Sequence, residues 1–211
     1  MTESPNLPFF PLGLVAFPGE VVNLHIFEPR YRELFAELEE AGTTFVIIPH
    51  IEARLKSVGT EMRLKEVAKR YPSGELDVRV EGVGVVDVLD FQDPLPGKLY
   101  AGGAVQRRPR AFDAPDTQSA KLLRERCTDL QLSLRVHTEL PNEDEPGLSF
   151  KLGHRMGLSL QEEFRLLTID NEPERQEFLL RAVERAIKTA KTTEEMRHRV
   201  QMNGHFRYIQ S

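Results

Sequence analysis

In the first half of the chain, short runs of β-branched residues alternate with turn-forming segments. Four runs have the partly alternating pattern that is typical of strands, at residues 21–26, 44–48, 76–80 and 83–88. The Pro-Ser-Gly sequence at residues 72–74 has turn chemistry, which predicts a hairpin between a strand that ends near Tyr71 and the next strand. This half is therefore predicted to be rich in β-structure.

One helix is predicted to interrupt these strands. Its apolar positions recur at helical spacing, and they are Tyr31, Leu34, Phe35 and Leu38. Pro29 suits the first turn, where a backbone N–H would have no partner within the helix, and Gly42 is suited to end the helix.

The second half of the chain has the longer periodicity of amphipathic helices. One apolar stripe predicts a long helix and comprises Ala120, Leu123, Cys127, Leu130, Leu134 and His137. Three further helices are predicted from their inward-facing positions. The first has Leu148, Leu152 and Met156 and ends at Gly157, and the second has Leu160, Phe164 and Leu167 and begins at a capping box of Ser159 and Glu162. The third has Leu179, Val183, Ala186 and Ala190. Four such helices predict a bundle, and Thr192 is predicted to cap a last short helix that ends at residues 203–204.

The change from strand-like to helical periodicity predicts the domain organisation. It falls near the Arg107-Arg108-Pro109-Arg110 segment and the prolines that follow it. We therefore predict the fold class α+β, with a β-rich domain over residues 1–112 and an α-helical bundle over residues 113–211.

The opening segment combines prolines, a glycine and aromatic residues. Pro8, Pro11 and Pro18 restrict the backbone and Gly19 permits a turn, so we expect an extended run followed by a sharp reversal.

Two interpretations of the aromatic residues in this segment stay open. Phe27 has the position of a core residue, whereas Phe9 and Phe17 could be partly exposed and hold an apolar peptide. Glu28 precedes the predicted helix and can accept backbone N–H groups at its start, while Arg30 can pair with a carboxylate.

The same segment resembles a known family. The runs Leu7-Pro8-Phe9-Phe10-Pro11-Leu12, Phe17-Pro18-Gly19 and Ile26-Phe27-Glu28-Pro29-Arg30-Tyr31 resemble the start of the Lon N-terminal domain. Residues 57–60 and 77–83 resemble two strands of that family, and residues 160–167 resemble its late helix. The resemblance extends to about Ala190.

This resemblance implies both a fold and a role. It implies a PUA-like, β-rich domain followed by a helical bundle, in which the motif residues are structural: Pro11, Pro18, Gly19, Glu28, Pro29, Arg30 and Tyr31. In Lon, the N-terminal domain recognises substrates, and the ATPase and peptidase are separate downstream domains for which this chain is too short. The resemblance thus implies a recognition module without the catalytic domains.

Composition and charge limit the cellular compartment and the class of binding partner that we expect. The net charge is −5, and acidic residues outnumber basic ones in both halves, so neither half is expected to be a basic nucleic-acid-binding module. The single cysteine, Cys127, cannot form an internal disulfide. The sequence has neither a secretory signal nor a run of transmembrane length, so we expect a cytoplasmic protein that does not bind membranes.

The sequence also lacks recognisable catalytic motifs. It contains no phosphate-binding loop, no His-Glu-x-x-His pair and no counterpart of the Ser-Lys peptidase segment of Lon. The Gly82-Val83-Gly84 run lies in a β-rich stretch and predicts a bulge or a close backbone contact, and Cys127 lies on the helical stripe as a small core residue. We therefore predict no catalytic residue, no cofactor and no metal, and hence not an enzyme.

The leading hypothesis is a non-catalytic module that binds unfolded or tagged proteins, or acts as a proteolysis adaptor, through a surface around Phe9, Phe17 and Phe27. A protease or a chaperone is a further expected partner. Two alternatives stay open: an RNA-binding PUA-like module that uses the basic 107–110 segment, and a hydrolase whose nucleophile and base converge only in the folded state. The sequence sets neither the ligand nor the oligomeric state.

Overall fold

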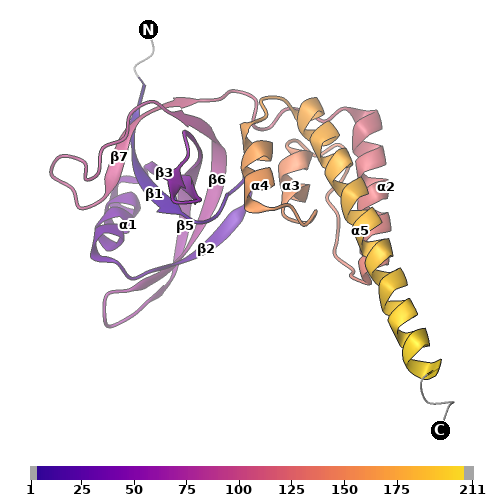
Figure 1. Cartoon of the computed structure of the whole chain (residues 1–211). Coiled ribbons are helices and arrows are strands. Elements are labelled where there is room, and N and C mark those ends of the chain that lie inside the picture. Colours follow the sequence, from indigo (N-terminus) through magenta and orange to yellow (C-terminus); the bar gives the residue numbers. More distant parts are fainter. Residues whose placement is uncertain (1–3, 207–211) are drawn as a thin grey trace.

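The computed structural model describes residues 4–206, with side chains described through residue 190 and at Thr192. The β-rich part contains β1 (Asn6–Leu12), β2 (Val21–Ile26), α1 (Pro29–Ala41), β3 (Thr44–Ile51), β4 (Arg54–Leu55), β5 (Val58–Arg70), β6 (Leu76–Val88) and β7 (Ala101–Arg107). The helical part contains α2 (Thr117–Leu134), α3 (Leu148–Gly153), α4 (Leu160–Thr168) and α5 (Glu172–Phe206). The two parts lie side by side, and α5 extends away from both (Figure 1).

The strands form a mixed sheet that closes on itself. The order β1-β7-β6-β5-β3 returns to β1, because β1 also pairs with β3 in parallel, whereas the other pairings are antiparallel. β2 pairs with the first half of β6, and the short β4 pairs with the end of β3, so the closure is irregular. The predicted α+β fold with a PUA-like mixed sheet is confirmed.

Alternation along the strands separates two hydrophobic clusters of the β-rich part. Phe9 and Val46 belong to a cluster inside the closed sheet, whereas their neighbours Phe10 and Phe45 belong to a cluster beneath α1. Successive side chains of a strand point to opposite faces, so a single apolar run can fill both clusters. The apolar face of α1 packs onto the second cluster, as its spacing predicts.

The ends of α1 follow from local chemistry. Pro29 occupies the first turn, and Gly42 adopts a left-handed conformation at φ 63° while its N–H donates to the Leu38 carbonyl. A left-handed residue after a helix is most easily accommodated by glycine, which has no Cβ. The predicted boundaries of this helix are confirmed.

The predicted hairpin joins β5 to β6 through residues 71–75. Arg70 pairs with Leu76, and Gly74 donates to the Tyr71 carbonyl at 2.9 Å. The runs at residues 76–80 and 83–88 form one strand, β6, with a register shift at Val83, so the predicted bulge is confirmed. The strand β7 was not predicted from the sequence.

The four predicted helices of the bundle are present, with changed ends. The capping box of Ser159 and Glu162 opens α4 as predicted. α2 ends at Leu134, because Arg135 turns left-handed at φ 55°, so the expectation that His137 continues this helix is wrong. α5 runs unbroken through Thr192, whose hydroxyl donates to the Lys188 carbonyl at 3.0 Å instead of capping a new helix.

A shared hydrophobic cluster joins the two parts of the molecule. It combines β-side residues such as Val15, Phe17 and Val85 with helical residues of α2, α3, α4 and α5. The division between residues 112 and 113 stays a prediction, because a shared cluster gives each part an apolar surface that the other covers.

A buried ion pair anchors the start of α5 at this junction. Glu172 and Arg175 are almost fully buried, and their side chains lie 3.0 Å apart. Arg175 also donates to the backbone carbonyls of Arg110 and Ala111, and its guanidinium lies 4.3 Å from the centre of the Phe150 ring. A buried charge needs such partners, so the backbone at Arg110 and Ala111 and the first turn of α5 are held in one arrangement.

Within residues 4–206, no helix combines the length and the apolarity that crossing a bilayer requires.

Candidate functional site

Two of the three aromatic residues predicted to bind peptide have no exposed surface. Phe9 lies inside the closed sheet, where its ring stacks on that of Phe91 with centroids 5.7 Å apart, and Phe17 is also fully buried. The expectation that these two side chains are exposed is wrong, because the β7 side of the sheet covers the first and the helical bundle covers the second.

Phe17 instead joins the two parts of the molecule. Its ring stacks on Phe150 of α3 with centroids 5.4 Å apart and lies 4.5 Å from the ring of His154. The turn at Pro18 and Gly19 directs it there, and the Gly19 N–H donates to the Gly82 carbonyl at 2.8 Å. A Cβ at Gly82 would lie 2.3 Å from the Phe17 carbonyl oxygen, so glycine permits this close approach, as the sequence predicted.

Phe27 is exposed over 59% of its surface, contrary to its predicted core position. It borders a hollow of about 280 Å³ that the motif residues Pro11, Glu28, Arg30 and Tyr31 also line. Part of the sequence motif is therefore brought together around this hollow, whereas Pro18 and Gly19 line another one.

The charged residues of the motif lie at the start of α1. Glu28 is the N-cap residue of α1, but its side chain makes no cap hydrogen bond. Its carboxylate lies 2.8 Å from the Arg30 guanidinium, which in turn lies 4.6 Å from the centre of the Tyr31 ring. The predicted pairing of Arg30 with a carboxylate is confirmed, and the predicted capping by the Glu28 side chain is wrong.

A histidine bridges the two parts beside Phe17. The two ring nitrogens of His154 lie 3.0 Å from a Glu20 carboxylate oxygen and 2.7 Å from one of Glu163. Burial by itself lowers the pKa of His154, but hydrogen bonds and attraction to the two carboxylates raise this pKa to about 9. At neutral pH the protonated imidazole therefore links β-rich and helical residues electrostatically.

Two arginines of the basic segment at residues 107–110 form ion pairs within the protein. Arg107 lies 2.7 Å from the Glu61 carboxylate, and Arg108 contacts the carboxylates of Asp87 at 2.7 Å and Asp170 at 2.8 Å. These ion pairs neutralise much of the charge that a nucleic-acid contact would use.

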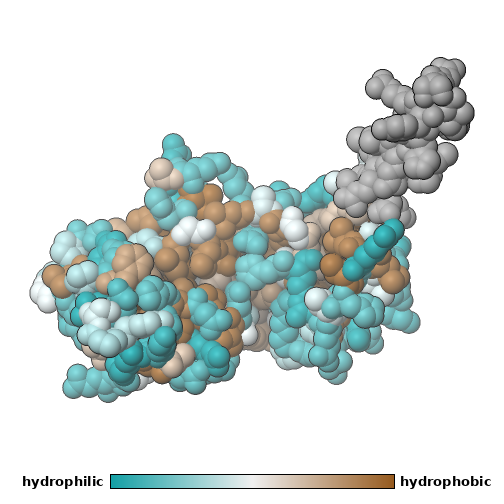
Figure 2. All heavy atoms as spheres, turned by 90° about the horizontal axis from the view of Figure 1, so that it is seen from below, coloured by the Kyte–Doolittle hydropathy of each residue, from teal (hydrophilic) through white to brown (hydrophobic). Residues whose placement is uncertain are grey.

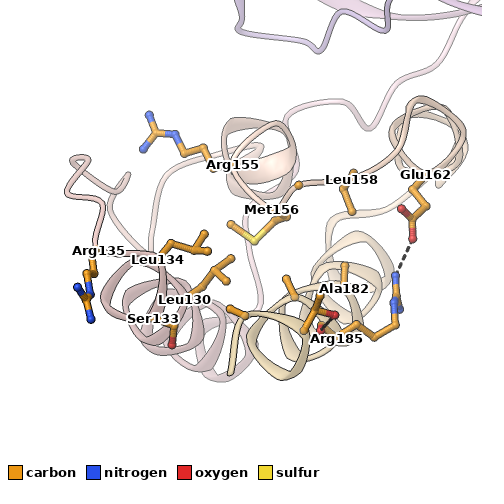
Figure 3. A pocket seen from close by; sticks show the side chains of 14 residues that line it. Leu130, Ser133, Leu134, Arg135, Arg155, Met156, Leu158, Glu162, Ala182 and Arg185 are labelled. Atoms are coloured by element: carbon orange, nitrogen blue, oxygen red, sulfur yellow. Dashed lines mark hydrogen bonds and ion pairs between the residues drawn. The ribbon is translucent and has the colours of Figure 1, made fainter. Parts of the chain in front are cut away.

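A groove of about 620 Å³ lies in the bundle between α2, α5 and the segment that joins α3 to α4. The apolar residues that line it are Leu130, Leu134, Met156, Leu158, Ala182, Ala186 and Ala190. Figure 3 shows the side chains of Leu130, Met156 and Leu158 directed into the hollow. In the view from below, hydrophobic surface also gathers on the helical part (Figure 2).

The groove forms where α2 ends and α5 presents small residues. Leu134 is the last residue of α2 and is 52% exposed, although the sequence stripe predicted it to face inward. Ala182, Ala186 and Ala190 recur every four residues on the facing side of α5. Small side chains opposite large ones leave space, and this alanine spacing is the sequence signal that could have indicated the groove.

Charged residues border the apolar lining. Arg135 and Arg155 are among the residues that line the groove, and on its α4–α5 side Arg185 lies 2.7 Å from the Glu162 carboxylate (Figure 3). An apolar floor with a polar border is the usual composition of a protein-binding surface.

The catalytic alternatives find little support in the described residues. Burial raises the pKa of the Cys127 thiol to about 12, and its Sγ lies 3.7 Å from the Met156 sulfur, so the thiol stays protonated in the core. Among the residues whose side chains the structure describes, 4–190 and Thr192, no group of three or more histidine, cysteine, aspartate or glutamate side chains could hold a metal ion.

A closed mixed sheet with an attached helical bundle is the architecture that this chain shares with solved Lon N-terminal domains. The family model of the ATP-dependent protease La (Lon) substrate-binding domain matches residues 6–185, and the chain belongs to this family. Membership supports a role in substrate recognition.

Individual relatives agree with this assignment. The chain is 26% identical to a Lon protease of Xanthomonas oryzae pv. oryzae over 219 aligned residues, which cover 92% of the chain but only 25% of that protease. The crystal structure of a Lon N-terminal domain protein from Xanthomonas campestris is 25% identical, with a TM-score of 0.67, and the match covers 83% of this chain and 97% of that one. The N-terminal domain of a Mycobacterium avium complex Lon protease shares the fold at 19% identity, with a TM-score of 0.61 over 85% of this chain and 98% of that one.

Proposed function

We propose that the protein is a non-catalytic module that binds apolar segments of unfolded or tagged proteins, and that the bundle groove is its main binding surface. The observation that carries this proposal is the apolar lining of the groove, including a half-exposed leucine at the end of α2. Its volume of about 620 Å³ lies within the range of roughly 300–1,000 Å³ that is common for ligand sites.

Apolar contact is the physical basis of the proposed binding. A ligand that covers Leu134 and the alanine face of α5 removes apolar surface from water, which is favourable whatever the sequence of the ligand. Such binding suits a module that must accept many different protein segments. Its affinity should depend only weakly on salt, because the main contribution is not electrostatic.

The surface at Phe27 is a second candidate for the same function. An exposed aromatic ring offers contact area with few rotatable bonds to order. Its hollow is less than half as large as the groove, at about 280 Å³, and His25, Glu28 and Arg30 are among the residues that line it. The groove in the bundle therefore fits an apolar ligand better.

Delivery of bound proteins to a protease or a chaperone is part of the proposal. The chain spans about a quarter of the Lon protease that it matches, and in that protein the matched region accompanies further sequence. RNA binding is less well supported, because Arg107 and Arg108 are engaged by carboxylates.

The test compares two leucines on the same helix. Leu134→Ser removes a groove wall, whereas Leu132→Ser removes an equally large and even more exposed residue that does not line the groove. Binding of a fluorescently labelled, permanently unfolded protein is measured by anisotropy at low and high salt. We expect Leu134→Ser to weaken binding by about fivefold, from partial loss of the roughly 1.5–3 kcal/mol of a buried leucine, and Leu132→Ser to have little effect.

A Phe27→Ser variant and a short RNA complete the experiment. If only Phe27→Ser weakens binding, the β-side hollow and not the groove is the site. If the RNA binds more tightly than the unfolded protein and its binding is lost at high salt, the protein-binding proposal is wrong.

A further inference from the structure

We infer that the outer edge of β2 binds an extended segment of another protein as an added strand, with apolar side chains at every second position of that segment. The inference rests on the proposed function only in taking unfolded protein as the source of the segment. It adds recognition of the main chain, at a surface apart from the bundle groove.

The strand β2 has a partner on one side only. It pairs with β6 over its whole length, and no other segment of residues 4–206 forms a backbone hydrogen bond with it. A strand carries hydrogen-bonding groups along both edges, so the outer edge of β2 is open to a further strand.

The backbone groups at this edge follow from the pairing with β6. The Gly82 N–H donates to the Glu20 carbonyl at 2.9 Å, where the pairing begins. Bonded and non-bonded pairs alternate along an antiparallel ladder, so the backbone groups of Val21, Asn23 and His25 point away from β6. All three residues are exposed, so a ligand can reach them.

Another edge of the same sheet is protected, whereas that of β2 is not. The pairing of β5 with β3 ends at Arg63. Beyond it, β5 has two register shifts and four charged residues, which are Lys65, Glu66, Lys69 and Arg70. Charges and bulges are the usual means by which an edge strand avoids pairing with another chain. The sequence of β2, Val-Val-Asn-Leu-His-Ile, contains no lysine, arginine, carboxylate, proline or glycine.

The two faces of β2 determine the side-chain pattern of the ligand. Ile26 is buried in the cluster beneath α1, and Val22 and Leu24 pack against this cluster. Asn23 and His25 alternate with them and are exposed. An added strand continues both faces, so its side chains should alternate between apolar and polar.

The hollow beside Phe27 accepts one of the apolar side chains. Its volume is about 280 Å³, and its lining includes Leu12, Leu24, Ile26 and Tyr31. When a peptide adds to a sheet edge, main-chain hydrogen bonds supply affinity and pockets for alternate side chains supply specificity. The outer edge of β2 and this hollow provide both.

A foreign segment fits this edge better than a second copy of the chain. If two copies pair symmetrically over the whole of β2, Glu20 of one copy lies opposite Phe27 of the other. Glu20 is already held within its own chain by the Phe17 N–H at 2.9 Å and the His154 ring at 3.0 Å, so its side chain is not available to fill the hollow. An unfolded segment can place an apolar side chain there.

The test uses two isomeric peptides with the same alternating apolar and polar sequence. One is N-methylated on the backbone amides of its apolar residues, and the other on those of its polar residues. An added strand uses the amides of every second residue, so one set of methyl groups blocks pairing and the other does not. Anisotropy with the full chain, and with its Leu134→Ser variant to weaken binding in the groove, should show affinities that differ by about tenfold or more, as expected from the loss of two or three hydrogen bonds.

Two substitutions of Asn23 locate the pairing. Asn23→Pro removes an outward N–H without removing a bond to β6, and it should weaken binding of the unmethylated peptide by about fivefold. Asn23→Ala keeps the N–H and should change the affinity by less than about twofold. Unchanged thermal midpoints show that both variants are folded, and the comparison of the two methylated peptides needs no change in β2.

The outcomes separate this inference from the function on which it rests. Equal affinities of the two isomers overturn the added strand and leave the proposed function standing, because apolar contact in the groove does not depend on backbone amides. Failure of every peptide and of an unfolded protein to bind overturns the proposed function itself. An equal loss in Asn23→Pro and Asn23→Ala, or self-association that Asn23→Pro abolishes, shows that the edge does not add a foreign strand.

Discussion

Phe17 of the β-rich part and Leu134 of the bundle are both large apolar residues, yet the first has no exposed surface and the second is 52% exposed. Phe17 lies between the β-rich part and the helical part, and each part contributes side chains that cover it. Leu134 lies at the last position of a helix, and the facing helix α5 presents the small residues Ala182, Ala186 and Ala190 to the same groove.

This difference bears on how a recognition surface is found. A dense aromatic motif is most simply a core motif, because aromatic side chains bury the largest apolar area and other elements pack around them. The surface that stays available lies where packing ends, at a helix terminus opposite small side chains. The predictions below test this contrast between the covered and the uncovered apolar residues.

Removal of the bundle should have the largest effect. A chain that ends at Phe112 exposes the β-side members of the shared cluster, which are Val15, Phe17, Ile51, Val58 and Val85. Their exposure to water removes on the order of 10 kcal/mol of stabilising free energy from the folded state, which is comparable to the total free energy of unfolding of a typical domain. We expect low solubility and no cooperative thermal unfolding, and a thermal midpoint equal to that of the full chain would show that the two parts are independent.

Single aromatic substitutions should separate the two environments. Phe17→Ala should lower the free energy of unfolding by about 3–5 kcal/mol, because it leaves a cavity between the parts. Phe27→Ala should change it by less than about 1 kcal/mol, because this ring is mostly exposed. The free energy of unfolding of both variants is measured by urea denaturation. Equal losses in the two variants would refute the contrast between a covered and an exposed aromatic residue.

The pH dependence of stability should reveal the link at His154. Its folded-state pKa of about 9 exceeds the ordinary value of 6.5, so protonation stabilises the folded state below pH 6.5, and this contribution is lost as the pH rises to 9. The side chain is partly exposed, so we expect a loss of only about 1 kcal/mol after allowing for solvent screening. The thermal midpoint measured from pH 6.5 to 9 should fall by a few degrees, and His154→Gln should flatten this dependence.

The last prediction concerns catalysis, for which we expect no turnover at all. The sequence contains no phosphate-binding loop, and the thiol of Cys127 is buried and protonated at neutral pH. We expect neither phosphate release from ATP nor degradation of casein by the purified protein. Activity that stays with the protein through repeated purification steps would contradict this prediction.

Local chemistry in the sequence determined many of the elements. Pro29 and Gly42 set the ends of α1, residues 72–74 turned the hairpin, and the capping box of Ser159 and Glu162 opened α4. These features depend on residues that are close together in the chain, through backbone conformation and short-range hydrogen bonds, so they can be predicted without knowledge of distant contacts.

The strand β7 shows where such local prediction stops. Gly102 and Gly103 make its sequence resemble a loop, but a Cβ on Gly103 would lie 2.1 Å from the Asp90 carbonyl oxygen, and a Cβ on Gly102 would lie 2.8 Å from that of Leu7. The glycines permit contacts with segments that are distant in the sequence, and only the tertiary structure reveals those contacts.

The positions of Phe9, Phe17 and Phe27 and the existence of the groove were decided by the tertiary structure alone. The sequence establishes that these side chains are apolar, and it even places Leu134, Ala186 and Ala190 on inward helix faces. Whether an apolar side chain is buried depends on which other segment covers it, and that segment is specified elsewhere in the chain. The groove exists because no described segment covers the end of α2 where it faces the alanines of α5.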